Sequence, residues 1–258
     1  MSASSLNLSE SFTKTKKNST ELCEKILRLF DGSKDVIQAG RNTLKLITLD
    51  NDQCVIKAFR VPTFPQNYSY GLISKSKAEK SFRNATKLIN LGFLSPKPIG
   101  YFEYRSQGKM LNSYYLCKFE EGSQTLADML DADPTLDDDL IQQFAEYSFN
   151  LHNKGVLHRD FNPNNILISQ VGSKYSFSLV DINRITWFKK LSLQQSMQSL
   201  ARLPLDDEVI DKLLHHYASK AQVNLDQCHS LLNQSRVKTQ RYFRNKKRFR
   251  KIFPKRKK

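Results

Sequence analysis

The sequence predicts an α+β fold with two lobes: an N-terminal antiparallel sheet with one helix, then a mainly helical C-terminal lobe that contains a catalytic hairpin. Three observations support this. Apolar segments of strand length alternate with turn residues between about residues 35 and 120, as in successive hairpins. Within them, residues 75–92 repeat apolar side chains at helical spacing. Further on, polar residues at fixed spacing, from His158 to Asp181, accompany two more short strands.

The segment HRDFNPNN runs from His158 to Asn165, and VDINR, with Asp181, follows it. An Asp, an Asn five residues later and a second Asp after an apolar strand are how protein-kinase-like folds place a base and two metal ligands around ATP. We therefore expect Asp160 to be the catalytic base, and Asn165 and Asp181 to bind Mg²⁺ through hard oxygen ligands. The competing interpretation is a salt-bridged turn at HRD with Asp181 as a strand-end cap.

The flanks of these residues predict a hairpin. Residues 165–169 and 175–181 have the composition of short strands, and the turn QVGSK between them contains Gly172. Such a hairpin would bring Asn165 and Asp181 together, as a shared Mg²⁺ site requires. The sequence thus favours a two-lobed protein-kinase-like fold and an ATP-dependent phosphotransferase.

A kinase also needs a strand lysine in the first lobe to hold the ATP phosphates. Lys57 lies in the apolar segment CVIKAFRV and is the candidate. Before it, the segment AGRNTLK predicts a tight turn at Gly40 between two strands. There we expect the backbone amides of Gly40, Arg41 and Asn42 to approach the phosphates, although the turn has no GxGxxG pattern.

The helix predicted at residues 75–92 has one acid, Glu79. In a kinase, an acid on this helix pairs with the strand lysine and orients it, so Glu79 is the candidate partner of Lys57. The alternative is that Glu79 is a surface residue among neighbouring lysines. Two further strands, within residues 94–104 and 113–119, lead to a polar segment at Glu120–Gly122. This segment is expected to be the hinge beside the adenine ring.

Taken together, HRDFNPNN, VDINR, VIKAFRVP and AGRNTLK resemble the lipopolysaccharide core kinase (Kdo/WaaP) family over about residues 35–225. This family is a branch of the protein-kinase-like fold. The resemblance implies phosphorylation of a sugar hydroxyl of the lipopolysaccharide inner core, on Kdo or heptose, with ATP and Mg²⁺ as cofactors and a glycolipid as partner.

The resemblance also implies residue roles. Asp160 would be the base, Asn165 and Asp181 the Mg²⁺ ligands and Lys57 the ATP anchor. Asn183 and Arg184 fit the polar-basic pair that this family tends to carry after the second Asp.

Departures from protein kinases point to a small-molecule or glycolipid acceptor. Asn162 stands two residues after the catalytic Asp, where Ser/Thr protein kinases usually have a lysine, and no APE sequence follows Asp181. Only 77 residues follow Asp181, and the last two dozen form a basic tail, which leaves little chain for a peptide platform. Two alternatives stay open: a Ser/Thr protein kinase, and a degenerate kinase-fold binding module tethered by its basic tail.

The expected organisation is a disordered N-terminus at 1–20, a kinase-like domain at 21–235 and a basic tail at 236–258. Within the domain, the N-lobe spans about 35–120 and the C-lobe about 121–235. A chain of 258 residues, 39% hydrophobic, can bury a substantial core. Its four cysteines have no CxxC spacing and predict reduced core residues of a cytosolic protein. A monomer is expected.

The formal net charge of +16 is concentrated at the C-terminus. Residues 236–258 contain thirteen Lys or Arg and no acid, interleaved with aromatic side chains. Such a segment, Arg236–Lys258, can dock on an anionic membrane; nucleic-acid binding and a solvated tail are the alternatives. No signal peptide or membrane span is apparent in the sequence. The expected location is therefore cytoplasmic, peripheral at the inner face of the cytoplasmic membrane.

Overall fold

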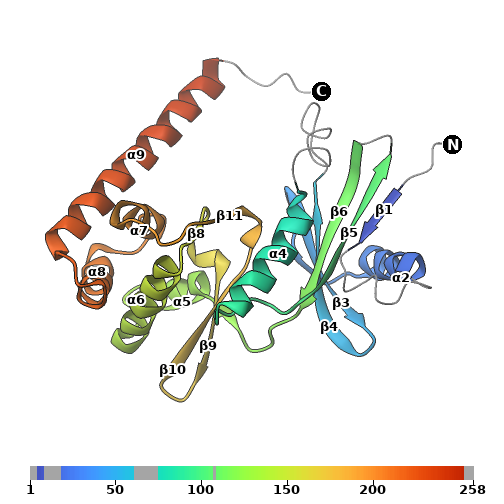
Figure 1. The fold of residues 1–258 in the computed structure, drawn as a ribbon, viewed down its shortest axis with the longest axis horizontal. Helices are drawn as coiled ribbons and strands as arrows, with labels where there is room; N and C mark the ends of the chain where they lie inside the picture. The colour runs from blue at the N-terminus through green and yellow to red at the C-terminus, as the bar shows by residue number, and fades with distance from the viewer. Residues whose placement is uncertain (1–4, 9–18, 61–74, 107–108, 253–258) are drawn as a thin grey trace. The chain divides into compact units, whose positions relative to one another are not determined.

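The computed structural model describes residues 5–8, 19–60, 75–106 and 109–252, and the chain forms two compact units (Figure 1). The described residues up to Ser123, together with Ser178–Arg184, form the first unit. Residues Gln124–Phe177 and those from Ile185 onward form the second. The division after Ser123 lies close to the lobe boundary expected near residue 121.

The first unit is built on a six-stranded sheet with the order β1-β5-β6-β4-β3-β2, and each neighbouring pair is antiparallel. The strands are β1 (Ser5–Leu8), β2 (Val36–Gln38), β3 (Asn42–Leu49), β4 (Asp52–Phe59), β5 (Pro98–Ser106) and β6 (Lys109–Lys118). The turn between β3 and β4 places Asp50 and Asn51 at positive φ, which these two residue types tolerate better than most.

Two helices, α2 (Ser19–Gly32) and α4 (Lys77–Asn90), cover opposite faces of this sheet (Figure 1). Cys54 and Ile56 of β4 pack in one apolar cluster with α2. Phe59 packs in another cluster with Ala78 of α4. Because successive strand side chains point to opposite faces, Lys57 shares the α4 face with Phe59.

The N-terminal end of the chain differs from the expectation. Residues 5–8, within the segment expected to be disordered, pair with β5 as an edge strand. Helix α2 begins at Ser19 and contributes Cys23 and Ile26 to the core of the first unit. That unit therefore begins well before residue 35. The remainder of residues 1–18 lies outside the described residues.

The second unit is mainly helical. Its helices are α5 (Leu126–Ala132), α6 (Asp138–Asn153), α7 (Leu193–Leu200), α8 (Asp207–Ala221) and α9 (Leu225–Ile252). Its short strands are β7 (Gln124–Thr125), β8 (Val156–His158), β9 (Ile166–Val171) and β11 (Ile185–Trp187). Strand β10 (Lys174–Leu179) follows β9 as the predicted hairpin, with Gly172 at positive φ in the turn. Its last two residues belong to the first unit.

Helix α6 leads directly into the catalytic segment. Gly155, one residue beyond its C-cap, has a positive φ of 74°. A Cβ on this glycine would collide with the backbone carbonyl of Phe188, and the Gly155 carbonyl accepts the Phe188 N–H at 2.8 Å. Both the positive φ and the lack of space for a Cβ therefore require glycine at position 155. This close approach holds β8 against β11, which pair through His158 and Ile185.

Helix α9 carries the first part of the predicted basic tail. The helix continues without a break from Leu225 to Ile252, so the boundary expected at Arg236 falls inside it; residues 253–258 lie outside the described residues. Arg236 contacts Asp207 at 3.4 Å and the Leu205 carbonyl at 3.3 Å, which ties this part of α9 to the start of α8. No described helix is both long and apolar enough to span a bilayer.

The four cysteines are buried and free: Cys23, Cys54, Cys117 and Cys228. Burial is the main cause that raises the pKa of each thiol above its ordinary value. They are therefore protonated apolar core residues, as their spacing predicted.

Candidate active site

In the first unit, Lys57 projects from the middle of β4. It is only 8% exposed, and its ammonium lies 5.5 Å from the centre of the Phe59 ring. The ammonium Nζ contacts Oδ1 of Asp181 at 2.6 Å. A buried lysine needs a partner for its charge, and the predicted Mg²⁺ ligand is that partner here.

Asp181 stands at the end of the segment that follows β10. Its φ of 50° is in the left-handed region, which Asp tolerates better than most residues. Non-glycine residues in such conformations cluster at functional sites. The side chain of Asn183 donates to Asp181 Oδ1 at 2.6 Å, so Oδ1 is shared by Lys57 and Asn183. Among the described residues, these two contacts are made by Oδ1 and neither involves Oδ2.

Neighbouring elements fix the backbone around Asp181. Asn84 of α4 donates through its side-chain amide to the Ile182 carbonyl at 2.7 Å. Ser95 donates to the Leu179 carbonyl at 2.9 Å, and the Leu179 N–H donates to the Leu94 carbonyl at 3.1 Å. The residues on both sides of Asp181 are thus bonded to the first unit.

The expected pair between Glu79 and Lys57 is not formed. Glu79 accepts from Arg83, one turn further along α4, at 2.7 Å. Its N–H donates to the N-cap Ser76 at 3.0 Å. Glu79 therefore lies in the first turn of α4 and on the face that carries Arg83. The structure pairs Lys57 with Asp181 instead.

The turn between β2 and β3 lies where the sequence placed it, with Gly40 before Asn42 at the start of β3. The Asn42 side chain accepts the N–H of Arg60 at 3.4 Å. A Cβ at Gly40 would meet nothing within 4 Å, and Gly40 is not at positive φ. Phosphate contacts by Gly40, Arg41 and Asn42 stay predictions.

The predicted hinge follows β6. The side chain of Ser178 donates to the Glu120 carboxylate at 3.0 Å. Burial raises the pKa of Glu120, and the Ser178 bond opposes that rise. Glu120 therefore connects the hinge segment to the strand that leads to Asp181, inside the first unit.

In the second unit, buried His158 supports the turn that carries Asp160. His158 is fully buried, and its Nδ1 accepts the N–H of Asp160 at 3.2 Å. Between them, Arg159 donates through Nε to Thr186 of β11 at 3.1 Å. Phe161, also fully buried, stacks on Phe144 of α6 with ring centres 6.0 Å apart. The turn is thus anchored in the unit through His158, Arg159 and Phe161.

Asn162 and Asn165 both bond to Asp160. Asn162 donates through Nδ2 to Asp160 Oδ1 and to its carbonyl, each at 3.2 Å. The Asn162 Oδ1 accepts the N–H of Asn164 at 3.0 Å and caps the short 3-10 helix η1 (Pro163–Asn165). Asn165 donates to the Asp160 carbonyl at 2.8 Å, which leaves its amide oxygen as a hard donor for a cation.

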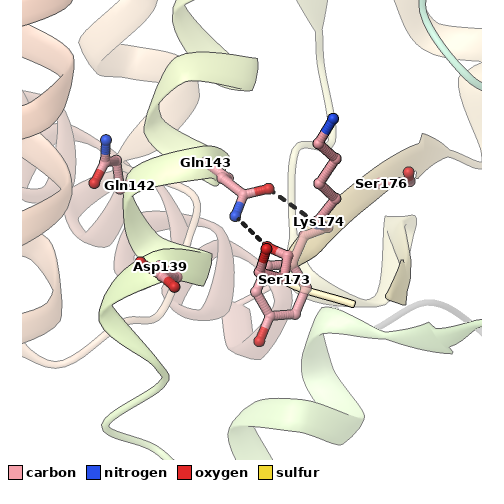
Figure 2. Close-up of a pocket in the computed structure, with 7 residues that line it drawn as sticks. Asp139, Gln142, Gln143, Ser173, Lys174 and Ser176 are labelled. Atoms are coloured by element: carbon pink, nitrogen blue, oxygen red, sulfur yellow. Dashed lines mark hydrogen bonds between the residues drawn. The ribbon is translucent and has the colours of Figure 1, made fainter. Parts of the chain in front are cut away.

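A hollow in the second unit lies at the tip of the hairpin (Figure 2). The amide of Gln143 spans it: Nε2 donates to the Ser173 carbonyl and Oε1 accepts the N–H of Tyr175, each at 2.9 Å. The Tyr175 hydroxyl donates to Asp137 at 3.0 Å. These polar groups attach the hairpin to α6, which gives the hollow a structural role.

No group of three or more His, Cys, Asp or Glu able to bind a metal is found in the part of the chain that the structure describes. The roles of Asn165 and Asp181 as Mg²⁺ ligands stay predictions.

The sequence did not predict the hydrogen bonds that the side chains of Asn84, Asn183 and Asn162 make in the structure. Asn84 lies seven residues after Lys77, on one helical face, but polar residues at this spacing usually indicate a solvated surface. Asn183 was expected only as one member of the polar-basic pair, with Arg184, that the family resemblance implies. Asn84 contacts a residue far along the chain, and Asn162 and Asn183 make contacts within turns. Hydrophobic periodicity predicts neither kind of contact.

The six-stranded sheet of the first unit, the mainly helical second unit and the polar motifs that they carry are typical of a phosphotransferase with the protein-kinase-like fold. A solved structure described as WaaP in complex with acyl carrier protein superposes with a TM-score of 0.63 at 17% identity, and the match covers 92% of this chain and 98% of that one. This likeness confirms the predicted fold class.

The chain belongs to the lipopolysaccharide kinase (Kdo/WaaP) family, whose sequence model matches residues 61–217. It is also 24% identical over 188 residues to a 3-deoxy-D-manno-octulosonic acid kinase of Vibrio parahaemolyticus serotype O3:K6 (strain RIMD 2210633), covering 69% of this chain and 74% of that protein. The predictions of a kinase, and of a lipopolysaccharide core kinase in particular, are confirmed. The roles of single residues stay predictions.

Proposed function

We propose that the chain transfers the γ-phosphoryl group of ATP to a hydroxyl of 3-deoxy-D-manno-octulosonic acid (Kdo) in the lipopolysaccharide inner core. The observation that carries the choice of sugar is the 188-residue similarity to a kinase of that name. Heptose is the alternative acceptor within the same family, whose model matches this chain.

In this proposal, Asp160 accepts the proton of the attacking sugar hydroxyl. The sugar oxygen forms a bond to the γ-phosphorus, the bond from that phosphorus to the β,γ-bridging oxygen breaks, and ADP leaves. The Asn162 bond to Asp160 Oδ1 orients the carboxylate. In the proposed reaction, a carboxylate oxygen of Asp160 receives the proton.

Lys57 would neutralise phosphate oxygens, and Asn165 and Asp181 would bind Mg²⁺. The ion would offset the negative charge of the triphosphate. The fit is supported by the Asn165 amide, whose nitrogen is bonded to the Asp160 carbonyl, and by the Asp181 carboxylate, whose Oδ1 alone meets Lys57 and Asn183. Each residue thus keeps one oxygen available for a cation.

The test is a transfer assay with purified chain, Mg·ATP and lipid A that carries Kdo. Mass spectrometry is expected to show a gain of one phosphate on the Kdo part. Asp160→Ala should abolish this gain, while a thermal-shift assay shows the same stabilisation by Mg·ATP as in the wild type. Transfer by Asp160→Ala at the wild-type rate would refute the assignment of the base, and transfer only to heptose would refute the choice of sugar.

We further propose that the basic segment Arg236–Lys258 docks the enzyme on the anionic inner face of the cytoplasmic membrane. The segment has thirteen Lys or Arg and no acid, and each cation near such a surface contributes about 1 kcal/mol. Part of it continues α9 as a helix.

Co-sedimentation with vesicles tests this docking. Binding to vesicles with anionic lipid is expected, with no binding to neutral vesicles and a loss of binding at high salt. Replacing Lys246, Lys247 and Arg248 by Ser should weaken it. Equal binding to neutral vesicles would contradict the proposal, as would a preference for RNA in a direct competition.

A further inference from the structure

The face of α4 that meets the Asp181 segment carries a lysine where a kinase is expected to carry an acid. Asn84 on this face bonds to the Ile182 carbonyl at 2.7 Å. Ser81 is buried one turn earlier, and Lys77 lies one turn before Ser81. Residues spaced i, i+4 and i+7 share one helical face. Lys77, and not Glu79, therefore occupies the face directed at η2 (Ile182–Arg184).

Positive charge accumulates around Lys77. Burial lowers the pKa of Lys77, and so do the nearby cations Arg41, Lys57 and Arg184; Asp181 alone acts in the opposite direction. All five residues belong to the first unit. Lys77 thus has three cations and one carboxylate among the nearby charges that act on it, and that carboxylate already pairs with Lys57 at 2.6 Å.

Such an excess of cations costs free energy in the protein alone, because like charges repel and a partly buried lysine loses hydration. A solvated surface lysine would avoid this cost by extending into water. Lys77 is instead partly buried, and its backbone carbonyl accepts from the Ser81 hydroxyl at 2.9 Å inside the helix. A multiply charged anion bound here would remove the cost and gain from all four cations.

We infer that Lys77 binds the polyphosphate of the nucleotide, so that α4 contributes a phosphate-binding cation and not an acid that orients Lys57. The inference rests on the proposed use of ATP and adds a specificity residue to it. The position of Lys77 also accounts for the pairing of Lys57 with Asp181, since α4 presents no acid to Lys57 on this face.

The test compares nucleotide binding by Lys77→Met, Lys77→Arg and the matched control Lys87→Met, an exposed lysine of the same helix. Calorimetry with Mg·ATP, Mg·ADP and adenosine is the measurement. Lys77→Met is expected to weaken Mg·ATP binding about 10-fold. Adenosine binding should be unchanged, because adenosine has no phosphate. Lys77→Arg should retain most of the affinity, and Lys87→Met should behave as the wild type.

Equal affinity of wild type and Lys77→Met for Mg·ATP would overturn the inference. A parallel loss of adenosine binding would also overturn it, because the effect of the substitution would then not depend on the phosphates. These outcomes are separate from failure of the proposed function. A wild-type chain that binds Mg·ATP but phosphorylates no Kdo refutes the acceptor and leaves the Lys77 test intact. A wild-type chain that binds no nucleotide overturns both.

Discussion

Asn162 acts as a positioning residue in the catalytic turn, although its amide stands where protein kinases usually have a lysine. One end of the side chain donates to Asp160 Oδ1, and the other caps η1 through the N–H of Asn164. A single side chain therefore contacts both the Asp160 carboxylate and the start of the helix that carries Asn165. These contacts of Asn162 order the carboxylate that we propose as the base, which favours an active site over a degenerate one.

We predict that Asn162→Ala lowers kcat by about 10- to 100-fold, because Asp160 loses the bond that fixes its orientation. Affinity for Mg·ATP should change little. Steady-state kinetics with Kdo-lipid A and calorimetry with Mg·ATP measure the two effects. The matched control is Asn164→Ala, an exposed neighbour that bonds to Asn162 through its backbone N–H. A comparable loss in Asn164→Ala would indicate a general disturbance of the turn.

At the scale of single residues, the sequence predicted candidate residues and did not predict how they pair. The spacing of HRDFNPNN predicted that Asp160 and Asn165 lie close together, and Asn165 donates to the Asp160 carbonyl at 2.8 Å, because a turn of fixed length sets which side chains converge. The partner of Lys57 could not be predicted, because it depends on how α4 is rotated about its axis. A rotation of about 100° per residue separates neighbours on a helix. Glu79, two residues from Lys77, consequently faces Arg83.

At the scale of elements, the strands and their turns follow the sequence closely. Gly172 predicted the β9–β10 turn, and Asp50 with Asn51 form the turn between β3 and β4. Both rest on local backbone preferences. What attaches the hairpin to α6 was not predictable, because Gln143 looks like any polar residue on a helix. The structure shows it bonded to the backbone of Ser173 and Tyr175.

We predict that Gln143→Ala lowers the free energy of unfolding by about 1 kcal/mol, because two hydrogen bonds to the hairpin are lost. Urea unfolding followed by circular dichroism measures this change. The matched control is Gln142→Ala, the exposed neighbour that lines the same hollow (Figure 2). The control should stay within about 0.5 kcal/mol of the wild type. Equal losses in both variants would contradict the attachment.

At the scale of the whole molecule, the hydrophobic pattern predicted a two-part chain but misplaced its ends. Strand β1 has only four residues, too few for a periodic signal. The basic segment contains no helix breaker before Pro254, and Lys and Arg are good helix formers. Its charge predicted a tail, whereas its backbone continues α9. The composition of residues 236–258 predicted their charge, but it could not predict that the backbone of α9 continues through Arg236.

The free energy of unfolding depends on pH through His152 in the core of the second unit. Burial lowers the pKa of His152 to about 3, while an unfolded histidine titrates near its ordinary value, 6.5. Its Nδ1 lies 3.1 Å from the Tyr217 hydroxyl, and its Nε2 has no hydrogen-bond partner among the described residues. The folded chain thus keeps His152 neutral where the unfolded chain binds a proton. Stability is therefore full above pH 6.5 and falls as the pH drops toward 3.

We predict that the wild type loses about 2 kcal/mol more than His152→Gln when the pH falls from 7 to 5, since each pH unit below 6.5 costs about 1.4 kcal/mol. Glutamine cannot bind this proton and retains a polar end for Tyr217. Carboxylates that titrate in the same range are present in both proteins and cancel in the difference. Urea unfolding of both proteins at pH 7 and pH 5 gives the four free energies. Equal losses in the two proteins would show that His152 is not the group that carries this pH dependence.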